Sequence, residues 1–426
     1  MAHQVNIEYE SYLRIADSVS ADVHDNIWRR FISAEGVLYD YVGLNGEVML
    51  PTPQECAELK PNALAWWSPI EDGAFFTGDY LLGLLQGFHA RPNDTTRAEI
   101  RRLVAGLYHL QDVCRTPGVI ARGVGADGQC HYPASSNDQC IPWILALWEY
   151  QSSEIPSEPE RQDCRLRIQK HIEAIRDHGW ILPGDQAGFE RGSFLYFDGL
   201  EGCLSSVHLA LVTKLLALLD GDDSEQLHID CMDTPQEGGQ TRRQLIAEGF
   251  TSIEWDSRLS WFSSHAQFAV RLLYRLEQNQ THKALYLQAL QRMGNLAAVG
   301  VLRYQAFDTS QEYTFTPDWR CMLECWEPQA SSAEAEVVAM RELALWAEAS
   351  PAIKAEKGTL LHAIPAAWIV MMSQDDALIE KWLPEIIEAI NHFDYDRIYY
   401  GALFFVENVV QEIRAWIGQR QVLSIS

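Results

Sequence analysis

Two aspartates, Asp72 and Asp138, each stand at the start of an apolar segment of the chain. The two segments read "EDGAFFTGDYLLGLL" and "SNDQCIPWILALWEY". A carboxylate at a helix start is stabilised by the helix dipole, so each aspartate could serve only as a cap. In the second segment Ser135 or Ser136 can cap the helix, which leaves Asp138 available. Two carboxylates that face each other can act as a proton donor and as a base or electrostatic partner.

Aromatic and polar residues accompany both aspartates. Trp and Tyr side chains can stack on sugar rings while offering a polar atom, and Arg can bind a carboxylate through two hydrogen bonds. Each such residue also has a plainer alternative role, as a core aromatic or as a tie between loops. We predict that a sugar substrate would meet a set drawn from these loops: Trp66, Trp67, Glu71, Arg122, His131, Tyr132, Gln139, Trp143, Arg191, Trp255, Arg258, His265 and Trp319.

The segments that carry these residues alternate between two kinds of predicted helix. Four apolar segments begin at residues 71, 136, 201 and 263, and each opens with small or polar residues. Between them lie amphipathic segments with charged faces, such as "TTRAEIRRLVAGLYHL". A helix that is apolar all round is buried, and an amphipathic helix covers it. Their alternation at a long, regular spacing indicates stacked helical hairpins.

The chain is therefore predicted to be all-α, an (α/α)6 barrel of six helical hairpins that forms one catalytic domain over residues 1–426. An open α-solenoid is the competing architecture. A closed ring would bring the polar starts of its inner helices to one face. Short strands are predicted in "GVIARGV" and "GSFLYF", and "LDGDDSEQ" is predicted to be a loop. The predicted helices span 5–42 with a break allowed, 72–88, 95–114, 136–152, 158–178, 201–220, 239–250, 263–279, 282–302, 335–349, 356–373, 377–393 and 396–418.

The segment "EDGAFFTGDYLLGLL" resembles the "DNGFW-x-G-x-LL" inner-helix start of the unsaturated glucuronyl and rhamnogalacturonyl hydrolases. Those enzymes belong to the six-hairpin glycosidase superfamily. The resemblance implies that Asp72 and Asp138 flank the sugar, because the family has one Asp in this motif and another at the next inner helix. It further implies that Asp138 protonates the double bond of a 4,5-unsaturated uronide and that Asp72 is its partner. Another glycosidase family of the same fold stays open.

The composition and the missing motifs exclude several classes of protein. A net charge of −26 disfavours binding to nucleic acid or to an anionic membrane surface. The nine cysteines have no zinc-binding spacing and are expected to be free thiols in a reducing compartment. No phosphate-binding glycine loop or H-E-x-x-H motif is present, so we expect neither a cofactor nor a metal.

The N-terminal residues have no signal-peptide pattern, and no apolar run approaches the roughly 20 residues of a membrane span. We therefore expect a cytoplasmic protein with a carbohydrate partner. Its oligomeric state is not predicted.

The leading prediction is a glycoside hydrolase that acts on a small oligosaccharide containing uronic acid, with Asp138 as general acid and Asp72 as base or partner. One alternative is a sugar epimerase or isomerase of the N-acylglucosamine 2-epimerase type, for which His265 and His362 could be the two bases. The other is a non-enzymatic helical-repeat binding protein. A separation of the two aspartates beyond roughly 12 Å would favour the binding protein, since glycosidase carboxyl pairs lie about 5 to 9.5 Å apart.

Overall fold

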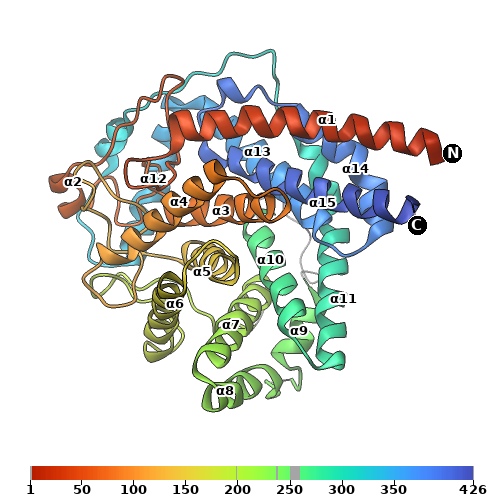
Figure 1. The fold of residues 1–426 in the computed structure, drawn as a ribbon. Coiled ribbons are helices and arrows are strands. Elements are labelled where there is room, and N and C mark those ends of the chain that lie inside the picture. The colour runs from red at the N-terminus through yellow and green to blue at the C-terminus, as the bar shows by residue number, and fades with distance from the viewer. Residues whose placement is uncertain (1, 198, 237, 250–259, 426) are drawn as a thin grey trace.

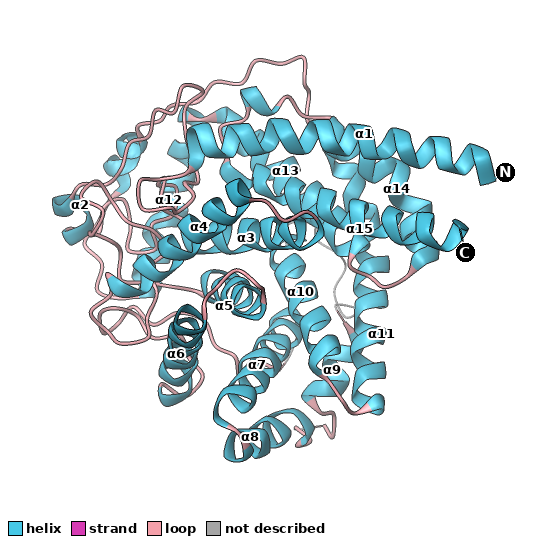
Figure 2. Cartoon of the chain, in the orientation of Figure 1, coloured by secondary structure: helices cyan, strands magenta, loops and turns pink. Residues whose placement is uncertain are grey.

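The computed structural model describes residues 2–197, 199–236, 238–249 and 260–425. Within these ranges the chain is helical, and β-structure is limited to three isolated bridges (Figure 2). The helices run around a common centre, so that the chain returns at its C-terminal end to helices from its N-terminal part (Figure 1).

Six of the described helices form an inner ring. In this layer α3 packs on α5, α5 on α10, α10 on α13, α13 on α15, and α15 on α3. The helix α7 joins the layer through its contacts with α10 and with α6. These helices are buried on most faces, as their apolar sequences predict. The inner helices are α3 (Gly73–Ala90), α5 (Asn137–Ser152), α7 (Gly199–Asp220), α10 (Ser260–Leu276), α13 (Pro351–Met371) and α15 (Phe405–Ile425).

The outer layer covers each inner helix with at least one partner. α4 packs on α3, α6 on α5, α8 and α9 on α7, α11 on α10 and α14 on α13, while α1 packs on both α15 and α14. The described helices thus make six hairpins in a closed ring, which confirms the predicted (α/α)6 barrel. The outer helices are α1 (Ala2–Asn26), α4 (Asp94–Asp112), α6 (Glu158–Asp177), α8 (Asp222–Asp233), α9 (Arg242–Glu248), α11 (Gln280–Ala297) and α14 (Asp376–Asn391).

The amphipathic pattern of α4 shows why the outer helices take their place. Its buried residues recur three or four positions apart and form one apolar stripe that faces α3: Ile100, Leu103, Val104, Leu107 and Leu110. The opposite face is charged and exposed. Asn93 begins the helix by accepting a hydrogen bond from the Thr96 N–H at 2.8 Å.

The inner helices α3 and α5 approach closely at one glycine. A Cβ atom added at Gly78 would lie 2.7 Å from the backbone of Pro142. Only glycine permits this approach, because any side chain would clash with the α5 backbone. The close packing holds the starts of α3 and α5, and therefore Asp72 and Asp138, in fixed relation.

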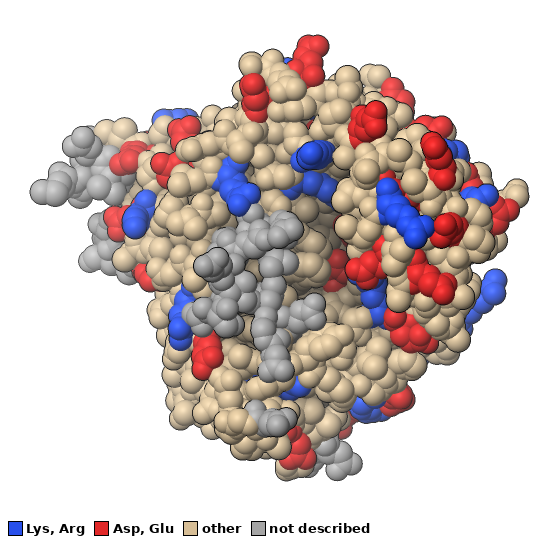
Figure 3. All heavy atoms as spheres, turned by 180° about the vertical axis from the view of Figure 1, so that it is seen from behind, with Lys and Arg blue, Asp and Glu red and all other residues tan. Residues whose placement is uncertain are grey.

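The remaining elements lie outside these two layers. They are η1 (Ile27–Phe31), α2 (Pro53–Ala57), η3 (Ala298–Ala306), η4 (Trp319–Cys325), α12 (Ser332–Ala349), η5 (Tyr395–Arg397) and η6 (Gly401–Phe404). The face turned away from the viewer in Figure 1 is hollowed near its centre, with acidic and basic side chains around the hollow (Figure 3).

Three details of the predicted secondary structure are wrong. The predicted helix over 5–42 stops at Phe31, and the chain then turns at Gly36, whose φ is 90°. The tract "LDGDDSEQ" is not a loop throughout, because α8 begins at Asp222. The predicted strand in "GVIARGV" does not form, since its backbone groups bond to helix ends instead: the Ala121 N–H donates to Leu110 O. In "GSFLYF" the pairing is confined to a single bridge.

One described helix contradicts the prediction that no apolar run approaches the length of a membrane span. Gly202–Asp220 within α7 has 19 residues and a mean hydropathy of 1.7, which is long and apolar enough to cross a membrane. However, 83% of that window is buried inside the protein, as in the core helix of a folded domain.

Candidate active site

Asp72 precedes α3 but does not cap it. Its side chain accepts no hydrogen bond from the first turn of the helix. That turn is instead capped by the neighbouring loop: the Ala74 N–H donates to Arg122 O at 2.8 Å, and the Phe75 N–H donates to Gln139 Oε1 at 3.2 Å. The carboxyl group of Asp72 therefore does not cap α3, although the residue stands at the N-cap position.

Asp138 lies in the first turn of α5, and its carboxyl group does not cap that helix either. Ser136 is the N-cap residue, yet its hydroxyl donates to Asp138 Oδ1 instead of accepting from the helix. Arg122 joins the two aspartates: Nη2 donates to Ser136 Oγ at 2.7 Å, and Nη1 forms an ion pair with Asp72 Oδ1 at 3.2 Å. Arg122 and Ser136 thus form a chain of hydrogen bonds between the two carboxyl groups.

Gln139 makes a second link between the two helix starts. Its Nε2 donates to Asp72 Oδ1 at 2.8 Å while its Oε1 accepts the Phe75 N–H. The donors that reach the Asp72 side chain among the described residues, Arg122 and Gln139, both meet Oδ1. Oδ2 is therefore the oxygen that can hold a proton.

Glu71 accepts hydrogen bonds from three donors. Tyr41 OH donates to Oε2 at 2.7 Å, the Trp67 N–H donates to the same oxygen at 2.8 Å, and Lys357 Nζ lies 3.1 Å from Oε1. Lys357 comes from the start of α13, so Glu71 ties this helix to the start of α3. The sequence predicts Glu71 as a substrate contact, but in this arrangement its two oxygens are bound within the protein.

Asp40 is a fourth carboxyl group at this place. It is fully buried, and its Oδ2 accepts the backbone N–H of Asp72 at 2.7 Å. Its Oδ1 has no hydrogen-bond partner among the described residues. Burial raises the pKa of Asp40 well above its ordinary value, and the charges of Asp72 and Glu71 raise it further. Burial and the neighbouring negative charges therefore favour the protonated form of Asp40.

The cluster contains more acids than bases, and this imbalance decides its protonation. The cluster has two cationic side chains, Arg122 and Lys357, and four carboxyl groups gather around them: Asp40, Glu71, Asp72 and Asp138. Burial raises the pKa of Asp72 to about 8, with repulsion from Glu71 and Asp138, although Arg122 and Lys357 oppose the shift. Asp72 therefore carries a proton at neutral pH.

Two tryptophans and two cations form the rim of the site. Arg191 lies over the Trp66 ring at 4.9 Å, and Lys357 lies over the Trp67 ring at 4.9 Å. Burial lowers the pKa of Arg191, as does the charge of Arg122, while Asp138 raises it, which locates Arg191 beside the two helix starts. Both tryptophans are partly exposed. Trp66, Trp67 and Arg191 thus lie in one region of the protein, and their contact with a substrate stays a prediction.

His265 lies deeper in the ring and is paired with a histidine that sequence reasoning passed over. The ring centroids of His208 on α7 and His265 on α10 are 6.1 Å apart. Both side chains are buried, and their ring nitrogens have no hydrogen-bond partner among the described residues. Burial lowers the pKa of each to about 3, and Asp138 is close enough to His208 to oppose its shift. Both imidazoles are neutral at pH 7.

The remaining predicted contacts lie elsewhere. Trp143 is fully buried and its indole N–H donates to Leu107 O, so it offers no face to a sugar. Trp319 is equally buried and donates to Met49 O. Tyr132 is buried and donates to Lys60 O. His131 is bound to Asp185. The burial of Trp143, Trp319 and Tyr132 corrects their prediction as substrate contacts, whereas His131 is partly buried and stays a prediction. Trp255 and Arg258 lie outside the described residues.

Sequence reasoning missed Asp40, Lys357 and His208. Asp40 and Lys357 have no local signal, because each reaches the site from a segment far along the chain. His208 did have one. It lies in the third apolar segment, in the polar opening that marks each inner helix. The repeated pattern that identifies Asp138 and His265 could therefore have identified His208.

The chain matches no protein-family model, and no curated protein sequence is significantly similar to it. One solved structure that it resembles is the glycoside hydrolase family 76 mannosidase Bt3792 from Bacteroides thetaiotaomicron VPI-5482. The two are 12% identical with a TM-score of 0.41, and the alignment covers 96% of this chain and 100% of the mannosidase chain. The assignment of the fold rests on the helix contacts described above.

Proposed function

We propose that this protein is a glycoside hydrolase that acts on a small oligosaccharide containing uronic acid. One observation carries the proposal: Asp72 and Asp138 lie at adjacent inner-helix starts, are released from capping, and are joined through Arg122 and Ser136. A pair of carboxyl groups in distinct environments is what glycosidic-bond cleavage needs, with one protonated and the other available as base or nucleophile.

The protonation of the pair supports a particular division of roles. The sequence resemblance implies that Asp138 is the proton donor and Asp72 its partner. The raised pKa of Asp72 instead favours Asp72 as the general acid, because an acid catalyst must hold its proton at the working pH. Asp138, with its Oδ1 held by the Ser136 hydroxyl, would then be the base or nucleophile.

The cations at the rim support a uronate as the substrate. The side chain of Arg191 is 23% exposed, and its guanidinium lies over Trp66, so an aromatic ring and a bidentate cation are presented together. A sugar carboxylate could bind the guanidinium through two hydrogen bonds while its ring contacts the indole. Arg191 now pairs with Glu336 at 3.1 Å, a pair that a uronate would replace.

A substrate screen tests the proposal directly. The purified full-length protein would be incubated with saturated and 4,5-unsaturated uronyl disaccharides. Hydrolysis would be followed by reducing-end release, and loss of the unsaturated bond would be followed by absorbance. We expect turnover of a uronyl substrate, and Asp138→Asn should abolish it while sugar binding, measured by calorimetry, persists. The matched control is Asp230→Asn, an exposed residue of α8. Full activity of Asp138→Asn would exclude its proposed role.

Removal of the rim cation should weaken the binding of uronates selectively. Arg191→Gln is expected to raise KM for a uronyl substrate about 10- to 100-fold, the value of a charge-assisted hydrogen bond, with kcat little changed. KM for the matching neutral sugar should stay the same. The control variant is Arg341→Gln, whose side chain is 51% exposed and pairs with Glu327. Equal losses on charged and neutral sugars would contradict the assignment.

The buried histidine pair favours a second candidate, a sugar epimerase or isomerase. Such an enzyme needs two bases that face one substrate carbon, and two neutral imidazoles can each accept a proton. His208 is a histidine that lies beside His265. His362, the other predicted base, lies on α13, the helix that packs on α10. Reaction in deuterium oxide separates the candidates. An epimerase introduces deuterium at the inverted carbon and releases no new reducing end, whereas a hydrolase does the reverse.

A further inference from the structure

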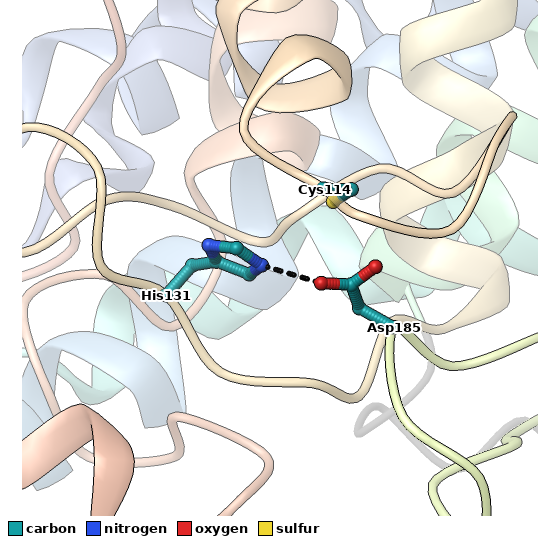
Figure 4. A group of neighbouring side chains, drawn as sticks. All are labelled: Cys114, His131 and Asp185. Atoms are coloured by element: carbon teal, nitrogen blue, oxygen red, sulfur yellow. Dashed lines mark hydrogen bonds and ion pairs between the residues drawn. The ribbon is translucent and has the colours of Figure 1, made fainter.

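Three side chains with metal-binding atoms converge outside the acidic cluster. Cys114 follows the end of α4, His131 lies in the loop that leads to α5, and Asp185 lies in the loop after α6. One potential ligand atom from each lies within 4.8 Å of the other two (Figure 4). All three residues are partly buried. The three sequence positions have no regular spacing, so only the tertiary structure brings them together.

The two ring nitrogens of His131 face different groups. Nδ1 lies 3.0 Å from the carbonyl oxygen of Gln129, and Nε2 lies 3.0 Å from Asp185 Oδ2. A neutral imidazole has a single N–H, so it can satisfy only one of these two acceptors. If Nδ1–H donates to Gln129, the lone pair of Nε2 faces the carboxylate of Asp185. Either a second proton or a metal ion is needed there.

The surroundings match the arrangement of a metal-binding histidine. A backbone carbonyl that accepts Nδ1–H fixes the ring and leaves Nε2 free to bind the ion. Asp185 is oriented in the same way: the Thr116 N–H donates to Oδ1 at 2.6 Å, while Oδ2 points toward His131. The Cys114 thiol now donates weakly to Leu110 O at 3.5 Å, a bond that a thiolate ligand would give up.

We propose that Cys114, His131 and Asp185 bind one Zn²⁺ ion, with water as the fourth ligand. Thiolate, imidazole and carboxylate are the three ligand types that zinc uses, and tetrahedral zinc accepts three of them plus water. The charges balance, because the thiolate and the carboxylate together neutralise the ion. Binding requires loss of the thiol proton to solvent and involves no redox step.

The ion would join the two loops that carry the cationic residues of the acidic cluster. His131 lies in the same loop as Arg122 and Ser136, and Asp185 precedes Arg191 in the next loop. The two loops already touch where the Asp185 N–H donates to Pro133 O at 2.8 Å. Zinc would lock this contact, so its role is to hold the loops in place and not to contact a substrate. The inference does not depend on the proposed function.

Metal titration of the full-length protein without an affinity tag tests the site. The protein would be stripped with a chelator and titrated with Zn²⁺ against a chromophoric chelator, and with Co²⁺ by absorption spectroscopy. We expect one tight equivalent of Zn²⁺ and a near-ultraviolet thiolate-to-cobalt charge-transfer band. Cys114→Ser should remove the band and weaken zinc binding at least 100-fold. Cys321→Ser, at an exposed cysteine outside the cluster, should behave as the unmodified protein.

Two results would overturn the site. The first is that the unmodified protein binds Zn²⁺ no more tightly than Cys114→Ser does. That result would mean that His131 carries a second proton and binds no metal ion. The second is a cobalt spectrum of the unmodified protein without the thiolate band, which decides the question even if Cys114→Ser does not fold. In support, added Zn²⁺ should raise Tm of the unmodified protein and of Cys321→Ser, but not that of Asp185→Asn.

Discussion

Asp72→Asn is expected to lower kcat/KM on a uronyl oligosaccharide by about 10²- to 10⁴-fold, the contribution of a general acid. Asparagine keeps the size of the side chain and can still accept the hydrogen bonds from Arg122 and Gln139 at its carbonyl oxygen. It has no carboxyl proton to donate to the leaving group. Asp72→Asn should therefore lower kcat, and its circular dichroism spectrum should match that of the unmodified protein.

A substrate with an activated leaving group separates the two aspartates. An aryl uronide with an acidic phenol departs without protonation, so Asp72→Asn should regain most of its activity on it. Asp138→Asn should stay inactive on both substrates, because a base or nucleophile is needed in either case. If Asp138→Asn were the variant rescued by the aryl uronide, the roles would be those implied by the sequence resemblance.

The pH dependence of the reaction follows from the raised pKa of Asp72. A general acid works only while protonated, so activity should be retained below pH 8 and should fall as the pH rises through about 8. On the uronyl oligosaccharide this alkaline limb should be absent from the residual activity of Asp72→Asn. Profiles of kcat/KM against pH, recorded for the unmodified protein and for Asp72→Asn, measure this alkaline limb. An unchanged alkaline limb in the variant would assign the limb to another group.

Asp79→Asn is expected to make the protein less sensitive to alkaline pH. Asp79 lies inside α3, fully buried, and neither carboxyl oxygen has a hydrogen-bond partner among the described residues. Burial raises its pKa well above the ordinary value. The folded protein therefore keeps the proton at a pH where the unfolded chain, with an Asp pKa of about 3.9, has lost it.

The sign of this effect is fixed by the proton balance. Above the unfolded pKa the native state binds one more proton than the unfolded state, so the free energy of unfolding falls as the pH rises. The slope from this one residue is up to about 1.4 kcal/mol per pH unit, and it ends above the folded pKa. Asparagine does not titrate, so the variant loses this slope and gains relative stability with rising pH.

Urea unfolding at several pH values between 5 and 8 measures the difference. The other buried acids titrate in both proteins, so the difference between the two curves isolates Asp79. Asp230→Asn, at an exposed position, should run parallel to the unmodified protein. Parallel curves for Asp79→Asn would mean that the carboxyl group finds a partner or stays ionised in the folded state.

The sequence by itself determined the alternation of inner and outer helices and indicated some of the residues of the candidate site. Buried inner helices need apolar residues on most faces, and outer helices need a single apolar stripe, so the two kinds can be read from local composition. The polar openings of the inner helices marked Asp72, Asp138 and His265 in the same way. A local pattern cannot distinguish an aromatic residue of the core from one that stacks on a sugar. Trp143 and Trp319 were therefore predicted wrongly, since both are fully buried.

Only the tertiary structure decided which groups meet and which of them hold protons. Asp40 and Lys357 reach Asp72 and Glu71 from distant segments, and no short-range pattern records that contact. The pKa of Asp72 depends on its burial and on the charges of Glu71, Asp138, Arg122 and Lys357, so the proposal that it donates a proton needed the folded chain. The same holds for Cys114, His131 and Asp185, because a metal site is defined by the distances between its ligand atoms and not by their spacing in sequence.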